Sequence, residues 1–420
     1  MVGPTVQDDL FSILIRFRQH KFIVSCDVEK MYRSIILDES QRSLQKIVFR
    51  FDPSESLQTY TLNTLTYGTA SAPYLATKCL VSLADKASND KVKSSIQRDF
   101  YIDIYISGGD TISETIDLCK EVIGILSSAK FNLRKFQSNS PEILKSIVHN
   151  QENVNNFLDL SRNNLNLSTK TSGVNWLCDI DCLSFHIKID KHKNITKRYI
   201  LSVISQIFDP LGLVGPCILE AKIIMQRLWI NKSDWDETIT GEIAHQWHSF
   251  ANALSSLNNL RTSRCVFSSD AVTREVHVFS DASERAYGAC LYIRTVDRYG
   301  NIKVSLLTSK NRIAPIKPTT IPRLELCGAL LGTRLCTKKK TKWHTSHGAI
   351  SVGTLVLIRD KDVPPLCWLL GRVVHLHPGA DGVTRVADIN TRKGIIRRAF
   401  NAICPLPIED TSRRGACSRP

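Results

Sequence analysis

The sequence predicts an α+β protein with more than one domain. Its 420 residues exceed what one compact core usually holds, so we expect two to three domains. Helical apolar spacings alternate with short apolar strands through most of the chain. The last part contains only short strands separated by Gly, Pro and Asp. This pattern favours an α+β fold that ends in a small β-barrel.

The N-terminal segment alternates helices and strands. Leu10, Leu14 and Phe17 share one helical face, which predicts an amphipathic helix. A later helix has Ser71 as its N-cap and Pro73 in its first turn. We expect helices over 6–20, 71–85 and 111–129, and strands over 21–27, 47–53 and 59–68.

A polar, Asn-rich stretch at 138–172 predicts a linker. A hairpin is expected over 174–189, and the Asp-Pro-Leu-Gly turn at 209–212 divides the apolar stretch 199–229 into two helices. Further on, we expect three strands from residue 274, a helix at 321–335, and short strands from residue 353.

Composition limits the function classes. The net charge of +15 and the sequence pI near 9.3 favour an acidic partner, and nucleic acid is the commonest large polyanion. No apolar run approaches the roughly 18 residues of a membrane span, and the polar N-terminus does not resemble a signal peptide. We therefore expect a cytoplasmic or nuclear protein that is neither secreted nor bound to a membrane; its oligomeric state is left open.

The 13 cysteines lack paired spacings, which indicates buried thiols in a reducing compartment. Cys178 and Cys182 in "CDIDC" have only His186 nearby. This spacing departs from the usual zinc motifs, so we expect no metal site there.

The positions of Asp27 and Asp103 in the sequence suggest a metal site as one interpretation. Asp27 ends a buried strand, and Asp103 lies at the bend of the hairpin "DFYIDIYISGGDT". If the strands are neighbours, the carboxylates converge, and converging carboxylates suit Mg²⁺, which prefers oxygen ligands. Two such ions, roughly 4 Å apart, can activate a 3′-hydroxyl and stabilise a leaving pyrophosphate. On spacing alone, the favoured interpretation is that the two residues are a strand-end cap and a turn residue.

Longer motifs around Asp27 and Asp103 resemble a known family, and this resemblance favours the metal site over the structural interpretation. "DVEKMY", "LTYGTASAPYLA" and "FYIDIYISGGDT" resemble, in the right order, the polymerase motifs of reverse transcriptases of Pao/BEL-type LTR retrotransposons. Similarity to the pol polyprotein of that family covers most of residues 2–335. It includes "SQIFDPLGLVGPCILEAKIIMQRLW" and "IAPIKPTTIPRLELCGALL".

The resemblance assigns roles to individual residues. Asp27 and Asp103 match metal-binding aspartates of the polymerase palm, with Mg²⁺ or Mn²⁺ as the implied cofactor. Tyr32 matches the aromatic residue that stacks under the incoming sugar and selects deoxynucleotides. Gly68 and Ser71 match the loop that contacts nucleotide and template in the family. A glycine there allows the backbone to approach these ligands closely. Lys135 matches, less securely, the lysine near the departing pyrophosphate.

One position departs from the family pattern. The hairpin normally carries two adjacent aspartates, but Ile104 follows Asp103 here. Neither Asp99 nor Asp110 shares the bend, and isoleucine ligates nothing. Less negative charge would then offset the repulsion between two cations. We expect RNA-directed DNA polymerase activity to be severely reduced or absent.

A second acidic pair resembles an RNase H domain. Asp281 in "HVFSDAS" is expected at the end of a central strand, and Glu325 in "PRLEL" on the helix after three strands. In the family an Asp–Glu–Asp cluster binds two Mg²⁺ and cleaves RNA in a hybrid. Alone, Asp281 would be an exposed strand end. No third aspartate follows, so hydrolysis is not expected, and the shortened sheet should leave an edge open to pairing or aggregation.

The C-terminal strands resemble the SH3-like domain that closes the integrase region of the same elements. No integrase core precedes them, so we expect an internal deletion near 336–346, besides loss of the protease and most of the polymerase fingers upstream. Basic clusters at 338–343, 391–398 and 411–420 are interpreted either as solvated chain or as phosphate contacts of low sequence preference.

These inferences give a domain plan and three hypotheses. The chain is either a degenerate pol product with impaired metal sites, a non-catalytic protein that binds RNA/DNA hybrid or DNA largely without sequence preference, or a product that does not accumulate stably. The expected domains are a reverse transcriptase palm with remnant fingers (1–140), a thumb or connection region (141–265), a truncated RNase H-like unit (266–336), a basic junction (337–347), an integrase C-terminal SH3-like domain (348–408) and a disordered basic tail (409–420).

Overall fold

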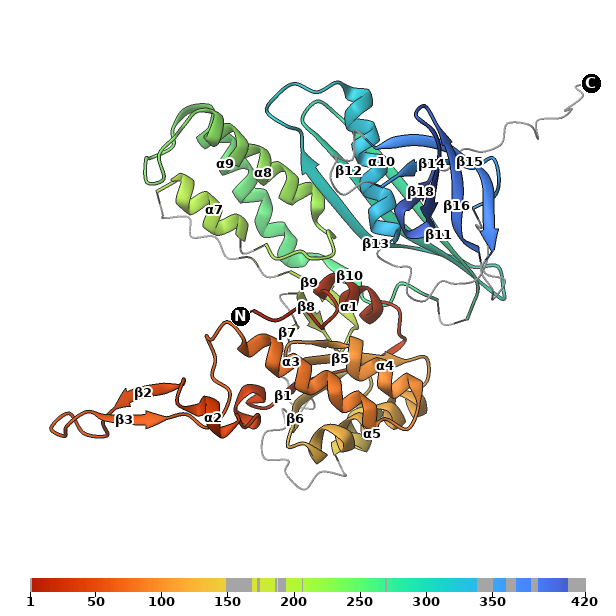
Figure 1. Ribbon diagram of the computed structural model, residues 1–420. Coiled ribbons are helices and arrows are strands. Elements are labelled where there is room, and N and C mark those ends of the chain that lie inside the picture. The colour runs from red at the N-terminus through yellow and green to blue at the C-terminus, as the bar shows by residue number, and fades with distance from the viewer. Residues whose placement is uncertain are drawn as a thin grey trace, which may run out of the picture. The chain divides into compact units, whose positions relative to one another are not determined.

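The computed structural model mixes helices with antiparallel sheets, which confirms the coarse prediction of a mixed α/β chain (Figure 1). It divides into two compact units, one of residues 1–279 and 289–313 and the other of residues 280–288 and 314–420. The structure describes residues 2–148, 168–171, 174–185, 187, 194–205, 207–268, 270–337, 350–359, 368–378 and 384–406. Most of the expected linker, His186, and nearly all of the basic junction and tail lie outside these ranges.

A four-stranded sheet forms the centre of the N-terminal region. Its order is β4-β5-β1-β6, and β1 pairs antiparallel with both β5 and β6. Alternate residues of β1, namely Val24, Cys26 and Val28, are buried in one apolar core with residues of the flanking helices. The strands are β1 (Phe22–Val28), β4 (Phe100–Tyr101), β5 (Ile104–Gly109) and β6 (Leu133–Ser138).

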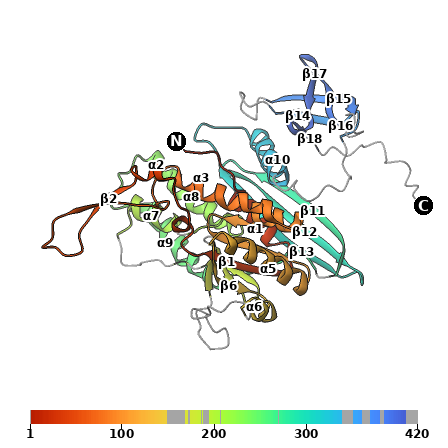
Figure 2. The same cartoon turned by 60° about the horizontal axis from the view of Figure 1, so that its bottom comes forward.

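Helices cover this sheet as the periodicity predicts. The first helix, α1 (Leu10–Phe17), contacts β4 and β5, and Asp9 caps it by accepting a hydrogen bond from the Ser12 amide. Figure 2 shows α5 and α6 beside β1 and β6. Helices α4 and α6 were not predicted. The remaining helices are α3 (Ala72–Ser82), α4 (Asp90–Arg98), α5 (Ile112–Ser128) and α6 (Pro141–Val148).

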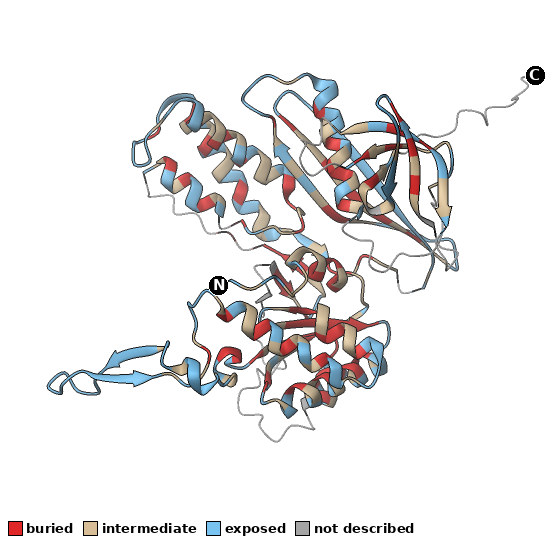
Figure 3. Ribbon diagram, in the orientation of Figure 1, coloured by how far each residue is buried: buried red, intermediate tan, exposed pale blue. Residues whose placement is uncertain are grey.

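A short helix, α2 (Glu39–Arg42), leads into the hairpin of β2 (Lys46–Phe49) and β3 (Gln58–Thr61). Both strands are exposed along their whole length (Figure 3). The aromatic rings of Phe49, Phe51 and Tyr60 contact one another edge to face, with centroids 5.1–6.4 Å apart. The two expected strands are confirmed, although neither contributes to a core.

The middle of the chain contains the predicted hairpin and the predicted pair of helices. Strands β8 (Val174–Leu177) and β9 (Cys182–Ser184) pair antiparallel in a sheet of order β10-β9-β8-β7. A third helix, α9, was not predicted; it packs Trp247 against residues of the other two. The other elements are β7 (Ser168–Thr171), β10 (Arg261–Ser263), α7 (Lys197–Ser205), α8 (Gly215–Ile230) and α9 (Gly241–Leu254).

Two buried arginines connect distant parts of the first unit. Arg264 donates to both carboxylate oxygens of Asp181, at 2.6 and 2.7 Å, and to the carbonyls of Phe17, His20 and Lys21. Arg18 donates to the carbonyls of Ser263, Arg264, Leu306 and Leu307. Burial, together with the charge of Arg264, lowers the pKa of Arg18 to about 10, so it stays charged at neutral pH.

Three long strands and a helix follow, as predicted. The strands β11 (Ala271–Ala282), β12 (Ala286–Asp297) and β13 (Ile302–Ile313) form a sheet of that order, and α10 spans Ile321–Thr337. The expectation that Asp281 ends a central strand is wrong for the described residues, because β11 is an edge strand. Apart from its two end residues, every residue of β11 is exposed.

The last described segment is a five-stranded antiparallel sheet of order β17-β16-β15-β14-β18. Val356, Val373, Ala387 and Ile389 form its small core. Short strands were predicted; a closed SH3-like barrel remains a prediction. The strands are β14 (Leu355–Ile358), β15 (Leu369–Pro378), β16 (Thr384–Thr391), β17 (Gly394–Ala399) and β18 (Ile403–Pro405).

The described cysteines form no disulfide, and Cys26, Cys119 and Cys178 are buried. Within the described part of the chain, no helix is both long enough and apolar enough to cross a bilayer.

Candidate carboxylate sites

The structure brings Asp27 and Asp103 together at the end of the N-terminal sheet. Asp27 is the last residue but one of β1 and lies opposite Ile104, the first residue of β5. The next amide, of Val28, donates to the Asp103 carbonyl at 2.8 Å. Strand pairing therefore fixes the two aspartates beside each other although 76 positions separate them in the sequence.

Lys135 joins this pair from the opposite side of β1. Its Nζ donates to Oδ2 of Asp27 at 2.9 Å, and this hydrogen bond raises the pKa of the lysine. The backbone of Lys135 is left-handed, with φ of +56°, and the β1–β6 register shifts between Ser25 and Asp27. This irregularity accompanies the contact between a β6 lysine and the end of β1.

The electrostatics of Asp103 reflect its neighbours. Burial, followed by the negative charge of Asp27, raises the pKa of the Asp103 carboxyl, while the positive charge of Lys135 opposes the shift. Two carboxylates face one lysine, so the pair carries net negative charge when both carboxyls are ionised. Carboxylate oxygens with unneutralised charge are donors of the kind that a hard divalent cation prefers.

The turn that carries Asp103 is strained. Ile102 has φ of +57°, a left-handed conformation that is a genuine outlier for a β-branched residue. Gln7 holds both polar groups of this residue: its Oε1 accepts from the Ile102 amide at 3.1 Å and its Nε2 donates to the Ile102 carbonyl at 3.3 Å. We call these two hydrogen bonds the Gln7 clamp. Strain of this kind recurs at functional sites.

Aromatic rings lie beside the carboxylates. Tyr32 is buried, and burial followed by the charge of Asp103 raises the pKa of its hydroxyl, which places the two groups within electrostatic reach. The ring of Tyr67 packs against that of Tyr32 with centroids 4.4 Å apart. Sequence reasoning missed Tyr67, although its position directly before Gly68 was a usable signal.

Gly68 and Ser71 lie in the loop between Tyr67 and α3. Gly68 has φ of +88°, a conformation that glycine adopts without strain. Ser71 occupies the N-cap position of α3, but its side chain makes no capping hydrogen bond. The predicted position of the cap is therefore confirmed and its expected hydrogen bond is not.

No nearby carboxylate replaces the one missing at Ile104. Asp99 is buried and accepts hydrogen bonds from Arg16 Nε at 2.9 Å and Ser107 Oγ at 2.7 Å, which ties it to the interior of the sheet. Asp110 is exposed at the far end of β5. Among the described residues, no third metal-binding side chain groups with Asp27 and Asp103.

Gly328 of α10 lies close to the backbone of Asp281. A Cβ atom added to Gly328 would lie 3.2 Å from the Asp281 carbonyl oxygen and 3.3 Å from that of Gly288. Glu325 precedes Gly328 by three residues, about one helical turn, so it lies on the same face of α10 as Gly328. Both acidic residues are exposed, and in the part of the chain with described positions no third ligand joins them.

The described residues form a mixed α/β protein in which Asp27 and Asp103 lie together at strand ends, while Asp281 is near the end of β11 and Glu325 is on α10. Residues 196–354 match the family model of the Pao retrotransposon-like RNaseH-like domain. Residues 335–406 match a family of unknown function, DUF5641, that is found in retrotransposon pol regions. Residues 196–354 are thus similar to the RNase H-like domain of Pao retrotransposons, and the resemblance inferred from the motifs is confirmed.

Two solved structures match this chain at low identity. One is the foamy viral protease-reverse transcriptase in complex with RNA/DNA hybrid, at 14% identity and a TM-score of 0.46, with 80% of this chain and 39% of that chain covered. Another is the foamy viral protease-reverse transcriptase dRH in complex with ds DNA, at 14% identity and a TM-score of 0.48, with 80% and 50% covered. This chain therefore spans half or less of their length. No curated protein matches it.

Proposed function

We propose that this chain is a degenerate retrotransposon pol product, descended from an RNA-directed DNA polymerase and RNase H, whose polymerase activity is severely reduced or absent. The observation that carries the proposal is the pairing of β1 with β5, in which Asp27 lies opposite Ile104. It puts a hydrocarbon side chain directly across the strand pair from the first aspartate, so Asp103 is the turn's only carboxylate.

The oxygen donors of Asp27 and Asp103 fit one Mg²⁺ or Mn²⁺ ion, with water completing its shell. When bound, such an ion would lower the pKa of a primer hydroxyl and neutralise charge on phosphate. Lys135 would balance part of the negative charge of Asp27, which it already contacts. Tyr32, supported by Tyr67, would present an aromatic surface to a nucleotide sugar. If two cations were bound, two carboxylates would offset the repulsion between them less than three carboxylates would.

The same reasoning applies to the RNase H-like region. Asp281 and Glu325 are two exposed carboxylates without a described third partner. Two-metal hydrolysis of RNA needs both ions held in place by shared carboxylates. We therefore propose that cleavage of an RNA/DNA hybrid by this chain is absent or very slow.

Primer extension on an RNA template tests the polymerase part. The purified chain is compared with Asp27→Ala and with Ile104→Asp, in Mg²⁺ and in Mn²⁺. We expect little or no extension by the unchanged chain and a partial gain in Ile104→Asp, because one added donor improves cation binding without adding contacts to the triphosphate. Robust extension by the unchanged chain that Asp27→Ala abolishes would refute the proposed impairment.

A second candidate function is non-catalytic nucleic-acid binding. Exposed cations on and beside β17 favour it, namely Arg392, Lys393, Arg397 and Arg398, together with the net charge of +15. Binding through phosphate contacts should weaken steeply with salt and show little sequence preference. Filter binding of hybrid, duplex DNA and single strands over a salt series measures this; affinity that does not change with salt would exclude it.

A further inference from the structure

An irregularity in the C-terminal sheet gathers three polar side chains on its outer surface. In the β15–β16 pairing, Val373 is opposite Ile389 and His375 is opposite Asp388, so Val374 is an extra residue. Val373 is buried, and strict alternation would turn His375 toward the same core. The bulge at Val374 reverses the alternation beyond it, since bulges re-aim side chains.

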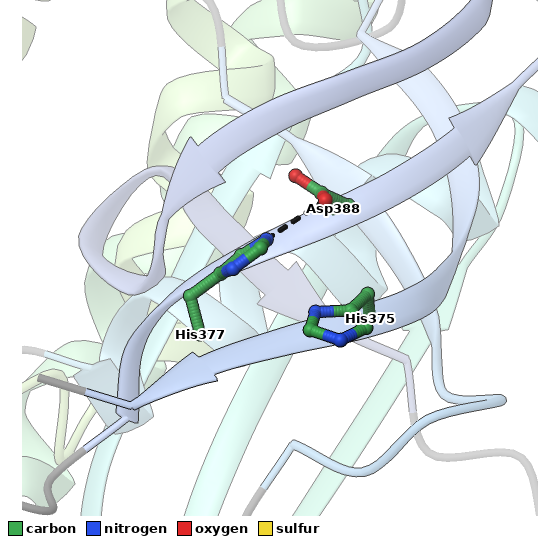
Figure 4. Close-up of side chains that lie close together, drawn as sticks. All are labelled: His375, His377 and Asp388. Atoms are coloured by element: carbon green, nitrogen blue, oxygen red, sulfur yellow. Dashed lines mark hydrogen bonds and ion pairs between the residues drawn. The ribbon is translucent and has the colours of Figure 1, made fainter.

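Beyond the bulge, the histidines project from one strand toward the aspartate of the next (Figure 4). His377 Nε2 lies 2.8 Å from Asp388 Oδ2, and the rings of His375 and His377 have centroids 4.6 Å apart. One ligand atom from each of the three residues can be chosen so that all lie within 4.8 Å of one another. His375 is exposed, and the other two are partly exposed, so an ion has access from solvent.

The donor set selects a class of ion. Two imidazole nitrogens and one carboxylate oxygen are borderline ligands, which suit Zn²⁺ and its neighbours among the divalent transition metals better than Mg²⁺ or Ca²⁺. Three protein ligands with an open fourth position is a common arrangement for zinc. The two acidic pairs described above offer oxygen only, so their chemistry differs from that of this cluster.

We propose that His375, His377 and Asp388 form a binding site for a divalent transition metal such as Zn²⁺. The site lies in the C-terminal sheet and does not depend on the proposed polymerase ancestry. It would fasten β15 to β16 beyond the bulge, where the regular ladder is interrupted.

Arg397 opposes the cation in this arrangement. It donates to both oxygens of Asp388, at 2.7 and 3.1 Å, from the neighbouring strand β17. The guanidinium therefore competes for the carboxylate and repels a positive ion. Replacing it should strengthen metal binding if Asp388 is a ligand.

The test measures Zn²⁺ binding to the full chain after treatment with chelator, by competition with a chromophoric chelator. We expect one equivalent of Zn²⁺ to bind and His375→Ala to weaken it about tenfold or more. His248→Ala replaces an exposed histidine of α9 and should leave affinity unchanged. Arg397→Gln should tighten binding several-fold. Circular dichroism verifies that each variant is folded.

Several outcomes would overturn the proposal. The histidines bind no metal if the full chain retains no Zn²⁺ at micromolar concentration, or if His375→Ala binds as tightly as the unchanged chain. Unchanged or weaker binding by Arg397→Gln would remove Asp388 from the ligand set. Co²⁺ serves as a spectroscopic probe: a sulfur-to-cobalt charge-transfer band would place the ion on some of the 13 cysteines instead.

Discussion

Ile102 illustrates how one residue can hold a turn in a costly conformation. The left-handed region costs an L-residue about 1–2 kcal/mol, more than the roughly 0.5–1 kcal/mol that glycine loses through its flexible unfolded state. We therefore expect Ile102→Gly to stabilise the protein by about 0.5 kcal/mol or more. Urea unfolding measures the difference. Ile102→Val keeps the strain and should gain nothing; equal effects of both variants would contradict the argument.

The raised pKa of Asp103 makes a pH-dependent prediction. Its folded form binds a proton more tightly than an unfolded aspartate, whose pKa is about 3.9. Its contribution to stability is therefore fully present below that pKa and is lost as pH rises through the raised value. Asp103→Asn stays neutral, so its free energy of unfolding should gain on the unchanged chain as pH rises. Urea unfolding at several pH values tests this. The prediction is contradicted if the free energy of unfolding of Asp103→Asn minus that of the unchanged chain stays constant or falls as pH rises.

Residue identity predicted part of the candidate site. Asp27, Asp103 and Tyr32 lie together as their motifs indicated. The contact between Lys135 and Asp27 depends on a register shift in β1 and a left-handed backbone in β6, and neither is visible in residue order. Gln7 and Tyr67 were missed because their contribution comes from packing across long separations in sequence.

The turn before α8 packs closely against β13, and a substitution at Gly212 tests how much this packing contributes to stability. Gly212 has φ of +70°, and an added Cβ would lie 2.0 Å from the Ser309 carbonyl oxygen of β13. The backbone here is also bonded to β13, since the Ser309 amide donates to the Leu211 carbonyl at 3.0 Å. We expect Gly212→Ala to destabilise the chain by about 2–4 kcal/mol, because strain and overpacking add.

A matched control separates those two causes. Gly300 has φ of +84° but open space around its Cα. Gly300→Ala should therefore cost only the backbone term, about 1–2 kcal/mol. Chemical denaturation of both variants gives the comparison, and an equal loss in the two would show that contact with Ser309 is unimportant.

Helices and strands with clear turn residues or apolar alternation could be predicted from the sequence. Which strands pair with one another was harder to predict. The Asp-Pro-Leu-Gly turn and the 174–189 hairpin follow from turn chemistry and alternation. The edge position of β11 depends on which strands are present elsewhere in the chain, so its own apolar sequence suggested a central strand. The bulge at Val374 likewise arises from pairing with β16 and leaves no sequence signal of its own.

At the scale of the first unit, Arg264 joins segments that are far apart in sequence. It contacts Asp181 on one side and, on the other, carbonyls at the end of α1 and just after it, and it is fully buried. Arg264→Leu would leave these groups without their donor. Breaking a buried ion pair costs about 3–5 kcal/mol, and we expect a loss of that size.

Arg261 provides the control for this prediction, because it lies three residues before Arg264, at the start of β10, and is exposed. Arg261→Leu should change stability by about 1 kcal/mol or less. Thermal unfolding of both variants decides the matter. A loss of similar size in the two would mean that Arg264 does not join the segments as described.

The Gln7 clamp has a practical consequence for anyone who produces this protein. Gln7 precedes the first helix, yet its side chain fixes the backbone beside Asp103. An expression clone that starts only a few residues later would keep every acidic residue and still release that turn. A tag fused close to the N-terminus would act on the same hydrogen bonds. A change in the stability or cation binding of such a preparation would thus reflect the cloning boundary rather than the chemistry of the carboxylates.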